Sequence, residues 1–202
     1  FMLVYIKEKD ELFYIDYRSQ SPKNASIEKL LGVKQVPDRD SKLWNRVDYT
    51  YLASGIPGTV YGLLEAHKNF GQLELNKIMQ PVIEQAENGI IVSKDLSYVI
   101  EVTPQLRSDK ESYSIYFNDG NPLKEFSVFK RPDLANTFKE ISKNGTKGFY
   151  EGVVADKIVQ SMKDNGGLIT HEDLKNYKSF FRMPIAINYK GFKVFTASPP
   201  SG

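Results

Sequence analysis

The sequence has 202 residues, of which 41% are hydrophobic and 26% are charged, and its formal net charge is +2. This composition is typical of a folded globular chain, and the scattered lysines disfavour nucleic acid or an acidic membrane surface as a partner. The longest apolar run, Phe1 to Ile6, is far shorter than the roughly 20 residues of a membrane-spanning helix. The absence of cysteine excludes disulfides, thiolate metal sites and a cysteine nucleophile, but it leaves the compartment open.

A β-hairpin is predicted at the start of the chain, with strands over Phe1–Lys7 and Leu12–Arg18. Both arms are apolar at nearly every position, which indicates strands covered on both faces inside a layered α/β sandwich. The second arm, in the stretch "LFYIDYRSQSP", ends on Arg18 before a turn. Arg18 is either an ordinary surface charge or a group directed at an anion, and the strand pattern leaves both interpretations open. Residues 22–48 are predicted to form a loop with a short helical turn.

Two amphipathic helices are predicted between residues 57 and 89. The first begins after Pro57 and Gly58 and ends at Gly71 in a left-handed cap. The second is capped by Asn76, carries a proline near its start and ends at Gly89. The expected apolar stripes are Val60, Leu63, Leu64 and His67 in the first helix, and Ile78, Met79, Val82, Ile83 and Ala86 in the second.

Glycines, prolines and caps divide the second half of the chain. A short helix is expected near Asp95–Glu101 and a turn at Asn118–Gly120, in the part of the sequence that is hardest to interpret. Thr170 and Asp173 resemble a capping box that starts a further short helix. The other predicted elements are a helix from Pro132 to Gly145, a helix over Val153–Met162 ended by Gly166 and Gly167, and a hairpin of Ile185–Tyr189 and Phe192–Thr196 around Lys190 and Gly191.

No motif of a common serine hydrolase, zinc protease or nucleotide-binding protein is present. His67 lies on a predicted apolar stripe and His171 in a helix first turn, so packing or capping is preferred to catalysis for both. The glycine-flanked turn Gly55–Thr59 is either a tight entry into a helix, which is the preferred interpretation, or an anion site at the helix amino end. The terminal "SPPSG" is either a rigid turn or the wall of a pocket.

Four stretches resemble the large subunit of the γ-glutamyltransferases, also called γ-glutamyl transpeptidases. They are "FMLVYIKEKDELFYIDYRSQSP", "SGIPGTVYGLLEAHKNFGQLELNKIMQPVIEQAENGIIV", "GFYEGVVADKIVQSMKDNGGLITHEDLKNY" and "YKGFKVFTASPPSG". They occur in the same order and at similar separations as in that family and cover well over half of the chain, whereas residues 98–131 match poorly.

The resemblance implies an α/β (α+β) fold of the N-terminal-nucleophile hydrolase class, a four-layer αββα sandwich that is incomplete in this chain. Residues 1–202 would form a single incomplete domain, with sheet hairpins at 1–18 and 184–197 and a mainly helical lobe over 57–178.

The implied activity is cleavage of the γ-glutamyl amide of glutathione-type substrates, with transfer of the glutamyl group to water, an amino acid or a peptide. The nucleophile is expected to be a threonine at the head of a separate small subunit, produced when a precursor cuts itself, with the threonine's own α-amine as the base. No cofactor and no metal are expected. The resemblance favours a periplasmic or extracellular location.

Arg18 is the site residue that the resemblance carries over to this chain. It occupies the position of the arginine in the family's Asp/Glu-x-Arg segment, which pairs with the α-carboxylate of the bound glutamyl group. A planar guanidinium can hold a carboxylate through two parallel hydrogen bonds. No catalytic residue is expected in this chain, because its threonines are internal and cannot supply a free α-amine. The chain is therefore expected to be inactive without its partner.

The sequence also departs from the family pattern. The glycine run before the first strand is missing, the proline and serine run near the end is shortened, and no threonine follows Gly202. Neither Phe1 nor Gly202 is expected to be a natural terminus. Two alternatives stay open: a related acylase of the cephalosporin acylase or poly-γ-glutamate hydrolase type, and a non-catalytic binding module of the same fold.

Overall fold

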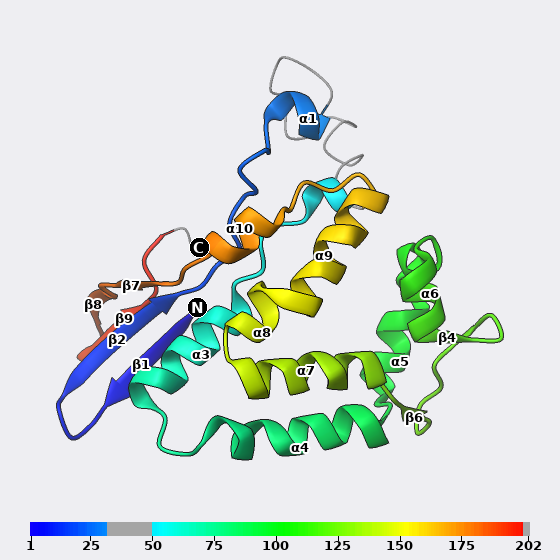
Figure 1. Cartoon of the computed structure of the whole chain (residues 1–202). Helices are drawn as coiled ribbons and strands as arrows, with labels where there is room; N and C mark the ends of the chain where they lie inside the picture. The colour runs from blue at the N-terminus through cyan, green and yellow to red at the C-terminus, as the bar shows by residue number, and fades with distance from the viewer. Residues whose placement is uncertain (32–49, 200–202) are drawn as a thin grey trace. The chain divides into compact units, whose positions relative to one another are not determined.

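A computed structural model of the chain describes residues 1–31 and 50–199 (Figure 1). Contacts between Cα atoms divide the chain into two compact units. The first unit consists of Phe1–Gln72 and Asn144–Gly202, and the second of Leu73–Lys143. Within the described ranges, no helix is both long enough and apolar enough to cross a membrane.

A three-stranded antiparallel sheet forms one side of the first unit, with strand order β1-β2-β7. Its strands are β1 (Met2–Ile6), β2 (Glu11–Asp16) and β7 (Phe180–Arg182). The predicted first hairpin is confirmed, but β7 was not predicted, and it pairs with β2 so that Asp16 lies opposite Phe180. Tyr14, Ile15 and Asp16 are buried at the end of β2. The central strand therefore ends in the interior, directly before Arg18.

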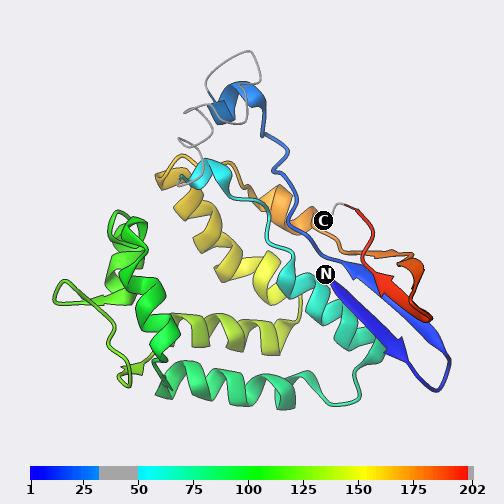
Figure 2. The ribbon, with the colours of Figure 1, turned by 180° about the vertical axis from the view of Figure 1, so that it is seen from behind.

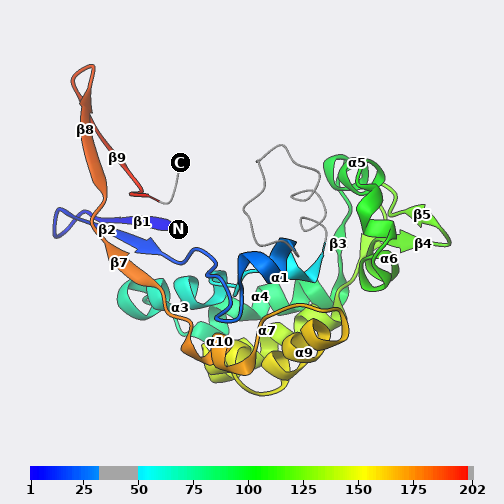
Figure 3. The ribbon, with the colours of Figure 1, turned by 90° about the horizontal axis from the view of Figure 1, so that it is seen from above.

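The predicted second hairpin is also confirmed, as β8 (Ile185–Tyr189) and β9 (Phe192–Thr196). Lys190 and Gly191 both have positive φ, at 48° and 84°, as expected for a tight two-residue hairpin turn. Within the described part of the chain, β8 and β9 pair only with each other. Figure 3 shows them turning away from the sheet of β1, β2 and β7. Every residue of both strands is exposed.

The described part of the first unit also contains six helical segments, of which α3 (Thr59–Phe70) lies beside the sheet (Figure 2). They are α1 (Ile27–Leu31), the 3-10 helix η1 (Tyr51–Ala53), α3, α8 (Lys147–Tyr150), α9 (Gly152–Asp164) and α10 (His171–Asn176). Residues 32–48 of the predicted loop lie outside the described residues. The buried core that joins α3, α8, α9 and α10 comprises Ile56, Tyr150, Ala155, Val159, Ile169, Leu174 and Tyr177. α10 begins with the predicted capping box of Thr170 and Asp173.

Three details of α3 and α4 (Leu75–Asn88) differ from the prediction. Gly71 is extended (φ −71°, ψ 144°) rather than left-handed, and its N–H group donates to the His67 carbonyl. α4 begins after Glu74, whose carbonyl accepts the first helical hydrogen bonds, so Asn76 does not cap it. The buried residues of α3 are Gly62 and Ala66, whereas Leu63 is 47% exposed.

The second unit is mainly helical, with short strand pairs between the helices. Besides α4 it contains β3 (Ile90–Ile91), α5 (Lys94–Glu101), η2 (Pro104–Arg107), α6 (Lys110–Tyr116), β4 (Phe117–Asn118), β5 (Asn121–Pro122), β6 (Val128–Phe129) and most of α7 (Pro132–Asn144). The predicted cap Gly89 has φ 98°, and the predicted turn places Gly120 at φ 81°. α6 was not predicted. An ion pair between Lys139 and Glu87 links α7 to α4.

Candidate functional site

The candidate site is built around Arg18, which follows the buried end of β2. The carboxylate of Asp16 is 7% exposed and has a partner for each oxygen. Oδ1 accepts the backbone N–H of Arg18 at 3.0 Å, and Oδ2 accepts Nε of Arg182, from β7, at 2.7 Å. Because a buried carboxylate without partners would be costly, these two contacts explain why an acid is tolerated there. They also fix the amide of Arg18 against the sheet.

A second buried side chain holds the carbonyl group of Arg18. The hydroxyl of Tyr177, which follows α10, donates to the Arg18 carbonyl oxygen at 2.9 Å. Tyr177 is only 1% exposed, and burial raises the pKa of its hydroxyl to about 12. The hydroxyl is therefore neutral and available as a donor at ordinary pH. Both backbone polar groups of Arg18 are thus satisfied by buried side chains, while the residue itself is exposed.

Two glycines let α3 lie directly against this segment. A Cβ on Gly58 would overlap the Tyr177 hydroxyl and the carbonyl oxygen of Tyr17, and a Cβ on Gly62 would overlap the Tyr17 ring. Gly58 is the residue before α3, and Gly62 lies one turn into it. The absence of side chains here, rather than an unusual backbone angle, permits the close approach.

The amino end of α3 is filled by a tyrosine. The hydroxyl of Tyr150 donates to the Pro57 carbonyl at 2.7 Å and accepts the N–H of Tyr61 at 3.2 Å. Tyr150 is 5% exposed, so this end of the helix is capped from within the core. The arrangement favours the tight-turn interpretation of Gly55–Thr59 over an anion site.

The structure places both histidines in helices. His67 is half-buried within α3. His171 is the first residue of α10 and lies 2.8 Å from Asp156, with both side chains largely exposed. In the ranges that the structure describes, no three His, Cys, Asp or Glu residues are grouped so that they could hold a metal ion.

The last described residues return to the strand that leads to Arg18. Ala197 is buried, and the carbonyl oxygen of Ser198 lies 3.4 Å from the hydroxyl of Tyr14 in β2. Tyr14 is 1% exposed. The beginning of the "SPPSG" stretch therefore packs on β2, while residues 200–202 lie outside the described part of the chain.

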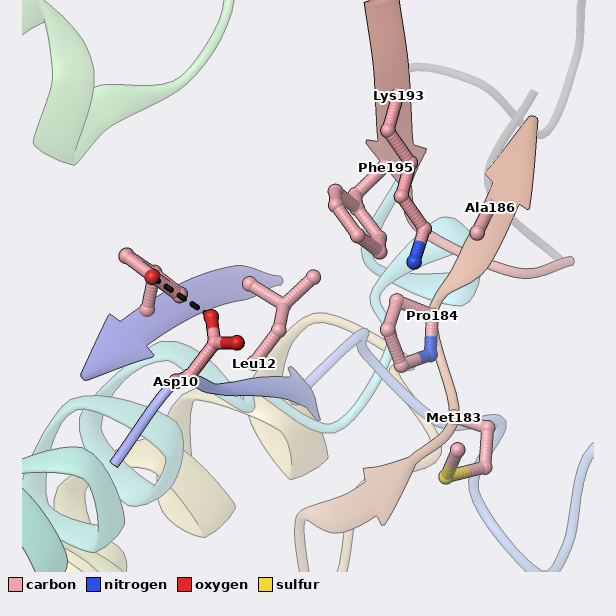
Figure 4. A pocket seen from close by; sticks show the side chains of 8 residues that line it. Asp10, Leu12, Met183, Pro184, Ala186, Lys193 and Phe195 are labelled. Carbon is pink, nitrogen blue, oxygen red and sulfur yellow. Dashed lines mark hydrogen bonds between the residues drawn. The ribbon is translucent and has the colours of Figure 1, made fainter. Parts of the chain in front are cut away.

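A separate pocket of about 730 Å³ lies between the first hairpin and the β8–β9 hairpin (Figure 4). Most of its lining is apolar. Its two charged residues are Asp10, which accepts a hydrogen bond from Tyr5, and Lys193. The lining residues are Tyr5, Asp10, Leu12, Met183, Pro184, Ala186, Lys193 and Phe195. None of the residues that hold Arg18 belongs to it.

Sequence reasoning identified Arg18 but missed the residues that hold it. Tyr177 ends the stretch "HEDLKNY", which predicts a capped helix and carries part of the family resemblance but gives no sign of a contact with Arg18. Arg182 lies in a strand too short to show a pattern. Asp16 could have indicated such a residue. An acid at the end of an apolar strand is expected to be buried, and a buried carboxylate needs a cationic partner.

Comparison of the sequence with known proteins identifies one family. A family model described as gamma-glutamyltranspeptidase matches residues 1–202. The glutathione hydrolase proenzyme of Escherichia coli K12 is 38% identical over 192 residues, which are 93% of this chain and 32% of that protein. The capsule biosynthesis protein CapD proenzyme of Bacillus anthracis is 40% identical over 147 residues, which are 72% of this chain and 26% of that protein.

The structure is also similar to solved structures. The crystal structure of Helicobacter pylori gamma-glutamyltranspeptidase matches with a TM-score of 0.89 and 34% identity, over 99% of this chain and 56% of that chain. The fold expected from the resemblance, that of the N-terminal-nucleophile hydrolases, is confirmed. The chain spans about a third of the length of the curated relatives that it matches.

Proposed function

Because this chain belongs to the gamma-glutamyltranspeptidase family, we propose that it is part of the large subunit of an enzyme that cleaves γ-glutamyl amides such as glutathione. Residues 1–202 would form one incomplete domain, which a small subunit completes. The amino-terminal threonine of that subunit would attack the γ-amide carbonyl carbon, with its α-amine taking the hydroxyl proton. The amine of the substrate would leave with a proton, and water or an amino acid would then accept the glutamyl group from the ester.

The observation that carries this proposal is the way Arg18 is held. Its amide and its carbonyl are each hydrogen-bonded to a buried side chain, yet the residue is exposed at the end of β2. A guanidinium on a fixed backbone is suited to grip the α-carboxylate of a γ-glutamyl group through two parallel hydrogen bonds.

The exposed apolar strands support the need for a second subunit. A two-stranded hairpin is only marginally stable in water, yet β8 and β9 expose large apolar side chains. These are Ile185, Ile187, Tyr189, Phe192, Val194 and Phe195. Burying them against another part of the enzyme would supply the missing stability and complete the layered sandwich.

Replacing Arg18 by alanine in the full-length enzyme tests the proposed role. Each charge-assisted hydrogen bond contributes about 1.5–3 kcal/mol, so losing two should lower kcat/KM for a γ-glutamyl anilide by about 10²- to 10⁴-fold. Lys9→Ala removes an exposed cation from the same hairpin and serves as the control, with unchanged kinetics expected. If Arg18→Ala behaves like Lys9→Ala, Arg18 does not bind the substrate.

The two rival functions are tested separately, the acylase by the same variant and the binding module by mass spectrometry. In an acylase of the cephalosporin type, turnover of a dicarboxylic-acyl substrate should be less affected by Arg18→Ala than turnover of a γ-glutamyl anilide is in the proposed enzyme. A non-catalytic binding module should lack a companion polypeptide that begins with threonine. Intact mass spectrometry of the purified full-length product detects that polypeptide directly, and its absence together with absent activity would favour the binding module.

A further inference from the structure

We propose that Tyr177 is a positioning residue for Arg18, and that α10 serves to hold the segment that carries this arginine. The inference rests on the proposed function, because it assigns Arg18 a carboxylate to bind. It concerns a different residue, one that would not touch the substrate.

Three hydrogen bonds tie the α10 region to the segment after β2. At the start of the helix, Oδ1 of Asp173 accepts the backbone N–H of Lys23 at 2.9 Å. At its end, Tyr177 donates to the Arg18 carbonyl at 2.9 Å. Between these contacts, the side-chain amide of Gln20 donates to the Lys178 carbonyl at 3.1 Å. α10 and the two residues that follow it therefore hold residues 18–23 at three points along their length.

The α10 region is itself firmly placed. The side chain of Thr170 accepts the N–H of Asp173, and Oδ2 of Asp173 accepts the N–H of Thr170, so the capping box is complete. Leu174 is fully buried. The ring of Tyr177 stacks on that of Tyr150, with an interplanar angle of 6° and a centroid separation of 5.7 Å. A hydroxyl fixed in this way defines where the Arg18 carbonyl must lie.

This backbone contact matters for the guanidinium because a peptide unit is planar. Fixing the amide of Arg18 through Asp16 and its carbonyl through Tyr177 restricts the two backbone torsions of Arg18. The direction of the Cα–Cβ bond is then set before the substrate arrives. Two parallel hydrogen bonds to a carboxylate are sensitive to small misplacements, so loosening the backbone should weaken substrate binding.

Two tyrosine-to-phenylalanine variants separate positioning from packing. Tyr177→Phe keeps the stacked ring and removes only the hydroxyl that contacts Arg18. Tyr150→Phe is the matched control, because it removes the hydroxyl of the other stacked ring, which contacts Pro57 and Tyr61 instead. Urea unfolding of both variants shows how much stability each has lost. If Tyr177→Phe weakens substrate binding more than Tyr150→Phe does, and the difference is not explained by their stabilities, the effect is due to the contact with Arg18.

A double-mutant cycle in the full-length, matured enzyme tests the proposal, with a γ-glutamyl anilide as substrate. Tyr177→Phe should raise KM by about 5- to 10-fold, the effect of one lost hydrogen bond, with little change in kcat. Tyr150→Phe should leave KM within about 2-fold of the parent enzyme. In the Arg18→Ala background, Tyr177→Phe should have no further effect on KM.

The possible failures are distinguishable. If Tyr177→Phe has the same effect with and without Arg18, or no effect, the tyrosine does not act through the arginine and the inference is overturned, while the proposed function stands. If Arg18→Ala leaves KM and kcat unchanged, the substrate-binding role of Arg18 is wrong and the inference falls with it.

Discussion

Replacing Gly58 by alanine gives a quantitative test of the packing between α3 and the Arg18 segment. The added Cβ would overlap both the Tyr177 hydroxyl and the Tyr17 carbonyl oxygen. Overpacking of this kind costs about 1–3 kcal/mol, and displacing the hydroxyl from the Arg18 carbonyl costs about 1 kcal/mol more. Alanine adopts the backbone angles of Gly58 (φ −109°, ψ −17°) without strain. The substitution therefore also gains about 0.4–1 kcal/mol from a less flexible unfolded chain.

The steric cost outweighs the entropic gain, so Gly58→Ala should lower the free energy of unfolding by about 1–3 kcal/mol. The measurement is a urea unfolding curve of the full-length enzyme, followed by tyrosine and tryptophan fluorescence. Lys68→Ala, on an exposed position of the same helix, is the control and should change stability by less than about 0.5 kcal/mol. Equal unfolding of Gly58→Ala and the parent protein would refute the close approach of α3 to Tyr17.

The remaining predictions concern single residues. Burial raises the pKa of Asp173, but hydrogen bonds from Lys23 and Thr170 outweigh that effect and lower the pKa from its ordinary value. Asp173→Asn should therefore cost about 1 kcal/mol at neutral pH, and in urea unfolding curves this difference from the parent protein should shrink as the pH falls and the Asp173 carboxyl becomes protonated. The raised pKa of Tyr177 has the opposite consequence. Its contribution to stability should be lost as the pH rises from 10.0 to about 12, and thermal unfolding of Tyr177→Phe should lack that part of the alkaline decline. The exposed ion pair of Lys139 should contribute little, so Lys139→Ala should shift the free energy of unfolding by less than about 0.5 kcal/mol. Ile141→Ala, in the buried face of the same helix, should cost about 2–5 kcal/mol in the same urea titration.

Local signals in the sequence predicted most of the regular elements. Runs rich in aromatic and β-branched residues identified the first hairpin, Lys190 and Gly191 marked the turn of the second, and Gly89 marked the end of α4. The capping box of Thr170 was recognised because its two members are only three residues apart. In each of these cases, the residues that determine the structure are neighbours in the sequence.

Contacts between distant parts of the chain were not predictable from these signals. β7 has three residues, and it becomes a strand because it pairs with β2, more than 160 residues earlier. The contact of Tyr177 with Arg18 spans 159 positions. The buried face of α3 was predicted wrongly for a similar reason. Tyr17 packs against Gly62, and a pattern of large apolar residues gives no sign of a buried glycine. Arg18 itself was found through the family resemblance, since its strand fits a surface residue equally well.

The exposed hairpin of β8 and β9 has a consequence for how such a protein is produced. Unpaired strand edges with apolar faces attract other chains and promote aggregation. If the covering segment were synthesised on the same polypeptide, it would be present at millimolar effective concentration as soon as it emerged. Making the two parts separately would leave the hairpin uncovered until they met by diffusion. Expression of residues 1–202 without a covering partner should therefore yield aggregates, and late cleavage of a joined precursor avoids that risk.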